Sequence, residues 1–469
     1  MTVPSEYIYK NKYKFLMVSA LSAFMGTLDG SIVNVSLPTL ARTFDVPIDA
    51  IAWIVLAYSL SISATLLMVG RLAVRRGFRF TYMMGFGLFG IGSSLCGFSE
   101  FFWQVVAARV IQGVGASFMM AAGPALITRS FPPDERGKGM GVMGTVVGIG
   151  LMSGPPLGGL IVSTIGWEWI FFLNIPVSIF GYMYAARLLK AMPAEAPESR
   201  LNYANWFLQA VTVIFLLLLL NRVNSPDWSG MALAILLVVG LTALSTFLWR
   251  ELKKDHPLIG LGIFKHSQFT LAISTMLISF MCTAAGMVLI PFYLEEILHL
   301  DPTHVGLVLV TIPIVTIIVA PTSGRISDKI GYRLLTTLGL AIMSVGIFWT
   351  STLDQFSTRT DVVLRLIVLG VGAGMYQTPN STVMMAAVPK KLTPIASGLL
   401  AVSRTLGMAG GVAIATAVFS YQRSIYAATM DEAASFVAAF SWVVVAFGLF
   451  NLVSMTISVF RKNRLDKVD

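Results

Sequence analysis

The sequence of 469 residues is poor in charge, in cysteine and in histidine. Charged side chains make up 12% of the chain, about half the roughly 25% of a soluble domain. Its two cysteines, Cys96 and Cys282, lie in apolar runs and offer neither a disulfide framework nor metal-ligand spacing. The four histidines form no HExxH or similar cluster, and the chain has no P-loop and no nucleophile–base constellation. We therefore expect no enzyme, no metal site and no cofactor.

Apolar residues dominate the chain instead. Hydrophobic residues make up 56% of it and the mean hydropathy is +0.78, so the sequence predicts a membrane protein with many spans. The first apolar stretch is too long for a cleavable signal peptide and contains Asp29, so we interpret it as an uncleaved span. A span needs about 20 mostly apolar residues, and we count fourteen such stretches: 15–38, 50–70, 80–98, 101–126, 138–163, 167–189, 203–221, 230–249, 268–293, 303–322, 334–352, 361–385, 394–420 and 435–460.

The basic residues are divided unevenly between alternate loops. If the N-terminus lies in the cytoplasm, most of the 33 Lys and Arg residues fall in cytoplasmic loops, and the loops on the other side hold only Arg42, Arg222, Arg359 and Arg423. Cytoplasmic loops of membrane proteins carry such an excess. The bias predicts that both termini are cytoplasmic, which requires an even number of spans. It also accounts for the net charge of +10 without a nucleic-acid partner.

Two pairs of similar segments occur at nearly the same separation. "GRLAVRRGFR" begins at Gly70 and "GRISDKIGYR" begins at Gly324, 254 residues later. "RVIQGVGA" begins at Arg109 and "RLIVLGVGA" begins at Arg365, 256 residues later. This spacing indicates a duplication, which is a common architecture of transporters that bind substrate near the membrane midplane and work by alternating access.

The duplication predicts an all-α integral membrane protein with two six-helix halves and two inserted helices. We expect residues 1–190 to form the N-terminal half, residues 191–262 the inserted pair with its linkers, and residues 263–469 the C-terminal half. The boundaries fall at "KAMPAEAPESR" and "RELKKDHPLIG", two charged segments that contain proline.

Five segments carry a resemblance to a known family: "LDGSIVNVSLP", "GRLAVRRGFR", "RVIQGVGAS", "GIGLMSGPPLGG" and "WEWIFFLNIPVSI". With these segments in order, the chain resembles the major facilitator superfamily, in particular its fourteen-span drug:proton antiporter-2 branch. The resemblance implies a monomeric secondary exporter in the cytoplasmic (inner) membrane of a prokaryote, which exchanges protons for a small amphipathic substrate across the lipid bilayer. The alternative is a dedicated exporter of a lipid or an endogenous metabolite on the same scaffold.

Asp29 and Arg109 are the candidates for proton coupling. At about 1.5 Å per residue, Asp29 lies about 21 Å into its span, roughly 9 Å from the outer face of a hydrocarbon core of about 30 Å. The span that contains Arg109 enters the membrane from that face, and Arg109 lies about 12 Å from the face. We therefore expect the two charges at the same depth in the membrane. A carboxylate inside a span costs about 2.5–3.5 kcal/mol on insertion scales. The pair either couples proton binding to a conformational change or is a static ion pair that fixes packing.

The repeated loop after the second expected span is a candidate for controlling the conformation. The family that the chain resembles has an acidic residue in this loop where the chain has Val74, whereas the second copy keeps it as Asp328. The resemblance implies that the contacts of the first copy with neighbouring helices are weakened. The candidate residues in the first copy are Gly70, Arg71, Arg75 and Gly77.

The expected span 138–163 contains a line of glycines and a pair of prolines. Glycines four residues apart leave one helix face flat, so that another backbone can approach closely. The resemblance equates this segment with the antiporter motif, which favours export over uptake, while ordinary tight packing is the alternative. The candidate residues are Gly150, Gly154, Pro155, Gly158 and Gly159.

Polar and aromatic side chains inside the spans are the candidates for a substrate cavity, because they suit amphipathic molecules that contain aromatic rings. Each of them is equally able to join helices or to lie at the membrane interface. Arg404, near mid-membrane, either forms hydrogen bonds between helices or supplies a counter-charge for the substrate. The other candidates are Asn34, Trp53, Tyr58, Gln112, Phe118, Tyr293, Tyr376, Gln377 and Asn380.

The charge bias generates a test of the topology. A cysteine placed at Ser225, in the "NRVNSPDW" loop, should react with a membrane-impermeant thiol reagent in intact cells, because this loop is expected outside. A cysteine placed at Ser199 should stay unlabelled, because that linker is expected in the cytoplasm. The reverse labelling would contradict the fourteen-span topology.

Overall fold

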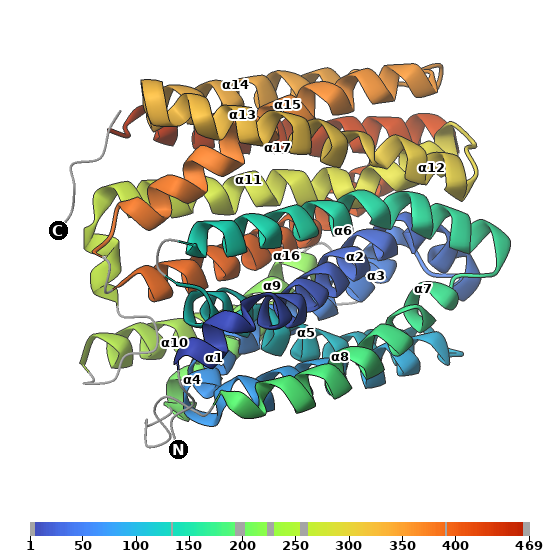
Figure 1. Ribbon diagram of the computed structural model, residues 1–469. Coiled ribbons are helices and arrows are strands. Elements are labelled where there is room, and N and C mark those ends of the chain that lie inside the picture. The colour runs from blue at the N-terminus through green and yellow to red at the C-terminus, as the bar shows by residue number, and fades with distance from the viewer. Residues whose placement is uncertain are drawn as a thin grey trace.

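The computed structural model describes residues 5–132, 135–192, 202–222, 229–253, 261–389 and 392–462. Every regular element in these ranges is a helix, and the long helices lie side by side in one bundle (Figure 1). The first helix, α1 (Ser5–Lys10), lies at the same end of the bundle as the last residues of α17 (Glu432–Val459). We call this end the terminal end and the opposite end the far end.

The N-terminal part of the bundle contains a sharp turn inside one long helix. This helix, α4, consists of two parts joined at Gly77, where the backbone has φ 82° and ψ 163°, a conformation that suits glycine because it has no Cβ atom. The helices of this part are α2 (Lys12–Phe44), α3 (Ile48–Ile51), α4 (Trp53–Gly97), α5 (Phe102–Ser130), α6 (Arg136–Thr164), α7 (Trp169–Phe172), α8 (Asn174–Leu188) and η1 (Leu189–Ala191).

The C-terminal part repeats this turn. Gly331, between α13 and α14, has φ 99° and ψ 160°, and it lies 254 residues after Gly77. The two copies of the repeated loop therefore turn in the same way. After α9 (Tyr203–Arg222) and α10 (Gly230–Lys253), the helices are η2 (Leu261–Lys265), α11 (Ser267–Phe292), η3 (Tyr293–Ile297), α12 (Pro302–Leu309), α13 (Thr311–Ile330), α14 (Tyr332–Thr350), α15 (Arg359–Ala386), α16 (Thr393–Tyr426) and α17.

Twelve helical segments in the described part of the chain are long and apolar enough to cross a membrane. Two further predicted spans, 80–98 and 203–221, are also helical. The first is the part of α4 after Gly77, and the second is α9, which contains the shorter apolar helix Tyr203–Leu219. The all-helical membrane fold is thus confirmed, whereas the count of fourteen spans stays a prediction.

The helix α6 packs closely against α2 through its glycines. A Cβ atom at Gly154 would overlap Ser31 Oγ, and one at Gly150 would overlap Thr27 Oγ1. Ser31 Oγ also donates a hydrogen bond to the carbonyl oxygen of Gly150, at 3.3 Å. Because these glycines have no side chains, the two helix backbones can approach each other closely.

The same helix meets the C-terminal part at the far end of the bundle. A Cβ atom at Gly159 would overlap the carbonyl oxygen of Pro302, at the start of α12, and one at Gly306 of α12 would overlap the carbonyl oxygen of Pro155. We call this contact between α6 and α12 the far-end seam. Thus α6 contacts α2 on one side and α12 on another.

Polar groups near the far-end seam fix the start of α12. The carboxylate of Asp301 accepts hydrogen bonds from the backbone N–H groups of Thr303 and His304, at 3.0 and 3.2 Å, as an N-cap residue does. The hydrogen bond with the His304 ring holds the pKa of the Asp301 carboxyl below its usual value. An ion pair joins α2 to η3 at the far end, where Arg42 Nη2 lies 2.6 Å from Glu295 Oε2.

The helix α9 lies between the N-terminal and C-terminal parts of the bundle. It contacts both α4 and α16. Trp206 Nε1 donates to the carbonyl oxygen of Ala64, and Gln209 Nε2 donates to that of Ser63, each at 2.8 Å. The helix α9 therefore touches helices of both parts, whereas its role as one of two inserted helices stays a prediction.

The close approach of α6 to α2 predicts different effects for two glycines of one helix. Alanine at Gly154 should lower the Tm of the purified protein, because overpacking costs about 1–3 kcal/mol. Alanine at Gly144 should leave the Tm unchanged or raise it, because no atom lies within 4 Å of a Cβ there and alanine favours helix over glycine by about 1 kcal/mol. Equal Tm values for the two variants would contradict the close packing of Gly154 against Ser31.

Candidate functional site

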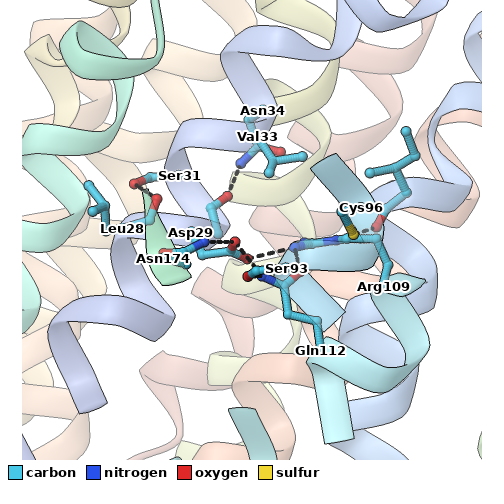
Figure 2. Close-up of polar contacts among 12 residues, drawn as sticks. Leu28, Asp29, Ser31, Val33, Asn34, Ser93, Cys96, Arg109, Gln112 and Asn174 are labelled. Atoms are coloured by element: carbon cyan, nitrogen blue, oxygen red, sulfur yellow. Dashed lines mark hydrogen bonds and ion pairs between the residues drawn. The ribbon is translucent and has the colours of Figure 1, made fainter. Parts of the chain in front are cut away.

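Asp29 lies in the middle of α2 and is fully buried, with 0% of its surface exposed. Its carboxylate points at side chains of α5 and α8, and a serine of α4 lies next to them (Figure 2). We call Asp29, Arg109, Gln112, Asn174 and Ser93 the Asp29 network. All five side chains are buried, so the network joins four helices inside the N-terminal part of the bundle.

Arg109 makes the ion pair of this network. Its Nη1 donates to Asp29 Oδ2 at 2.6 Å and to Gln112 Oε1 at 2.6 Å, and its Nε donates to the carbonyl oxygen of Ile54 at 3.1 Å. The ring of Tyr58 covers the guanidinium, 4.0 Å from Cζ. Asp29 and Arg109, which the sequence places at the same depth in the membrane, are thus in direct contact. The Arg109 side chain is held on several sides.

Two side-chain amides donate hydrogen bonds to the other carboxylate oxygen of Asp29. Gln112 Nε2 and Asn174 Nδ2 donate to Asp29 Oδ1, at 2.8 and 3.0 Å, and Gln112 Nε2 also donates to Ser93 Oγ at 2.7 Å. Both oxygens therefore have donors, as a buried carboxylate requires. Sequence reasoning missed Asn174 and Ser93. A signal existed for Asn174, which is the amide in "WEWIFFLNIPVSI", but nothing in the sequence singles out Ser93.

The network is neutral as a whole, and its neutrality depends on both charges. Burial of each ion costs several kcal/mol, which the partner and the added hydrogen bonds offset. A proton on Asp29 would cancel its charge and leave Arg109 buried without an anion. Loss of either charge would therefore leave the other ion buried without its partner in the contact of α2 with α5.

The predicted cavity residues of the N-terminal part do not share one surface. Gln112 belongs to the Asp29 network, and Phe118 makes an edge contact with Phe80. Asn34 donates to a backbone carbonyl of its own helix at 2.7 Å. The Asn34 Oδ1 and the hydroxyl of Tyr58 are buried and have no hydrogen-bond partner among the described residues.

The predicted cavity residues of the C-terminal part are mostly engaged with neighbouring helices. The Tyr376 hydroxyl donates to Thr275 Oγ1 at 3.0 Å, and the same Thr275 hydroxyl lies 3.4 Å from Asn380 Oδ1. The Tyr293 hydroxyl donates to the carbonyl oxygen of Asp354 at 2.6 Å. These three side chains join helices in this structure and do not line an accessible surface.

Other positions border accessible space. No atom lies within 4 Å of a Cβ atom at Gly26 or Gly30, and both glycines are partly accessible. They are four residues apart, so they lie on one side of α2. Gln377 of α15 and Arg404 of α16 are also partly accessible.

The repeated loop is described only in part. The side chains of Val74 and Asp328 lie outside the described residues, so the predicted asymmetry between the two copies stays a prediction. Arg71 and Arg75 are partly exposed where the first part of α4 ends, and Gly77 makes the turn that follows.

Comparison with known proteins agrees with this architecture. The chain matches the model of the Major Facilitator Superfamily over residues 19–412, and it belongs to this family. Its relatives include the riboflavin transporter RibZ of Clostridioides difficile, which is 31% identical over 98% of this chain and 99% of the relative. The multidrug export protein EmrB of Escherichia coli is 26% identical over 88% of this chain and 81% of the relative.

Solved structures share the fold at low identity. A peptide transporter (POT) crystallised with sulfate has a TM-score of 0.69 at 12% identity and covers 95% of this chain and 94% of its own. A bacterial homologue of the lysosomal transporter Spinster has a TM-score of 0.64 at 14% identity, with 96% of each chain covered. Together with the family, the helices identify a multi-pass membrane transporter of small substrates, which is not an enzyme.

The buried ion pair predicts a large effect on stability. Arg109→Gln should lower the free energy of unfolding by about 3–5 kcal/mol, because it leaves Asp29 buried without a counter-charge. Arg423→Gln serves as the control, since Arg423 lies 3.3 Å from the exposed Glu432 and such surface pairs contribute about 0–1 kcal/mol.

The double variant Asp29→Asn with Arg109→Gln removes both charges and should recover part of the loss in a thermal unfolding experiment. A double variant whose loss is the sum of the two single losses would show that the charges are not coupled.

Proposed function

We propose that the protein is a secondary exporter that couples the outward movement of small amphipathic molecules to the inward movement of protons. The observation that carries this proposal is Asp29, a fully buried carboxylate in the middle of a membrane helix, held by one arginine and two amides. Ionisable groups inside spans are costly, and they mark ion pathways and proton relays. Relatives named as multidrug export and multidrug resistance proteins support export.

The two halves of the proposed transporter are residues 1–190 and 263–469, with the helix pair of residues 191–262 inserted between them. The terminal end of the bundle is cytoplasmic, in keeping with the positive charge of its loops, and the chain lies as a monomer in the inner membrane of a prokaryote. With this orientation the far-end seam between α6 and α12 closes the outer side.

Coupling between the proton and the substrate runs through α2. This helix carries Asp29 toward α5 and α8, and it presents Gly26 and Gly30 to open space on another side. A substrate in that space contacts the backbone of α2 one residue away from the acid. Either ligand can thus bias the position of the same helix, which is what antiport requires of two sites.

The movement reaches the outer side through α6. Gly154 of α6 fits against Ser31, two residues after Asp29, while Gly159 of α6 fits against Pro302 of the other half. When a proton on Asp29 frees α2 from Arg109, a shift of α2 is passed to α6 and changes the far-end seam. The close packing at the glycines supports this route, because such contacts do not absorb a shift.

The second candidate function is export of one dedicated cargo on the same scaffold. The relative RibZ is named a riboflavin transporter, which motivates this alternative. Efflux assays in a host that lacks its own pumps separate the two: a broad exporter protects against several unrelated dyes and drugs, and a dedicated exporter protects against none.

Asp29→Asn tests the proposed role of the acid. In proteoliposomes this variant should lose transport driven by a pH gradient, because it cannot take up a proton, and it should still bind substrate, because asparagine keeps the shape of the side chain. The matched control is Asp45→Asn, at the residue that follows the same helix: Asp45 is exposed and has φ 50°, a conformation that asparagine also tolerates.

The control should transport like the wild type. Full gradient-driven transport by Asp29→Asn would remove Asp29 from the mechanism and leave a static ion pair as its role.

A further inference from the structure

Arg404 is a second basic residue deep inside the bundle. It lies eleven residues after Thr393, the first residue of α16, which is about 16 Å at 1.5 Å per residue, near the middle of a hydrocarbon core of about 30 Å. Charged residues at this depth are rare, and they usually face a partner or a water-filled space. The environment of Arg404 decides between these two possibilities.

Arg404 has no anionic partner among the residues that the structure describes. Its Nε is buried and makes no hydrogen bond, and no carboxylate acts on the guanidinium. Arg365 is different, because its Nε and Nη1 donate to the carbonyl oxygens of Trp349 and Asp361, at 2.9 and 2.8 Å. Arg109 is paired with Asp29. Of these three arginines, Arg404 alone keeps its charge uncompensated.

The guanidinium of Arg404 lies over an aromatic ring. Its Cζ is 5.0 Å from the centre of the Phe280 ring, and such a contact stabilises the cation without using any N–H donor. Gly407, one turn further along α16, fits against the backbone of Leu277 and against Phe280 Cβ, so the ring is held in place. The Phe280 ring covers the face of the guanidinium. The N–H donors in the plane of the guanidinium make no hydrogen bond to the described residues.

The side chain is partly accessible. Its Nε is buried, yet Arg404 as a whole is still partly accessible. Charged residues inside spans face the bundle interior or a water-filled cavity, so we infer that the accessible part of Arg404 faces a space that a small molecule or water can enter. Leu277 and Met281, on the same side of α11 as the stacked ring, are partly accessible as well.

The charges at this depth favour an anion. Asp29, the carboxylate in the middle of the described spans, is already neutralised by Arg109. A cationic molecule beside Arg404 would meet an unpaired positive charge with no carboxylate to offset it. An oxyanion would gain a charge-assisted hydrogen bond to the free edge of the guanidinium, a geometry that arginine offers to carboxylate, sulfonate and phosphate groups.

The geometry points to Arg404, backed by Phe280, as the binding group for an oxyanion of the transported molecule. The substrate class is therefore amphipathic molecules that carry a carboxylate, sulfonate or phosphate. This inference rests on the proposed function, because it names the substrate class of the same exporter.

Binding of charge-matched probes to the purified protein tests the assignment. The probes are 2-naphthoate with its amide 2-naphthamide, and dansyl-glycine with dansyl-glycinamide. The wild type should bind each acid at least tenfold more tightly than its amide. Arg404→Gln should raise the Kd of the acids at least tenfold and that of the amides less than threefold, while Arg404→Lys should keep part of the preference.

Two controls separate binding from folding. Arg404→Gln should not lower the Tm, because it removes an unpaired buried charge, and the acids should raise the Tm of the wild type but not of this variant. Arg423→Gln, at the far end, should leave all four Kd values unchanged. Equal binding of acid and amide by the wild type, or equal loss of both in Arg404→Gln, would overturn the assignment.

Transport assays tell this inference apart from the proposed function. Ethidium, a cation, and the two acids are tested in proteoliposomes with a pH gradient. A preference for acids in binding without gradient-driven transport of any probe would refute proton antiport and leave the oxyanion site standing. Gradient-driven transport of ethidium without any preference for acids would refute the oxyanion site and leave antiport standing.

Discussion

The contact on which the rest of the structure depends is the ion pair between Asp29 and Arg109. Neither charge is stable alone in the middle of a membrane bundle, so each requires the other and the hydrogen bonds around them. The pair therefore joins α2 to α5, and through Asn174 the same carboxylate is also joined to the first residue of α8. A single proton would break the charge balance, so we propose that this contact is both a source of stability and a point of control.

Close packing links α2 to the C-terminal part of the bundle. Glycines of α6 fit against Ser31 on one side and against Pro302 on the other, so α6 connects the buried acid to the far-end seam. The inserted helix α9 contacts α4 and α16 and spans the same boundary at another place. Arg404 has no counter-ion among the residues that the structure describes, and the transported molecule is the group proposed to supply one.

The sequence predicted the features that depend on distance along a helix. The rise per residue placed Asp29 and Arg109 at one depth, and the repeat of 254 residues anticipated the shared turn at Gly77 and Gly331. It did not predict how helices are rotated about their axes, because lipid-facing and protein-facing sides of a span are both apolar. For that reason Gln112 was expected at a cavity but lies in the Asp29 network, and Tyr376 was expected there but points at Thr275.

Antiport through Asp29 requires that the Asp29 network releases a proton when substrate binds. The most direct measurement is the pH change on adding a transported compound to purified protein in weakly buffered detergent solution. Wild-type protein that carries a proton on Asp29 should release it as the compound binds, and Asp29→Asn should bind the compound and release none. Equal proton release from the wild type and from Asp29→Asn would contradict the central claim.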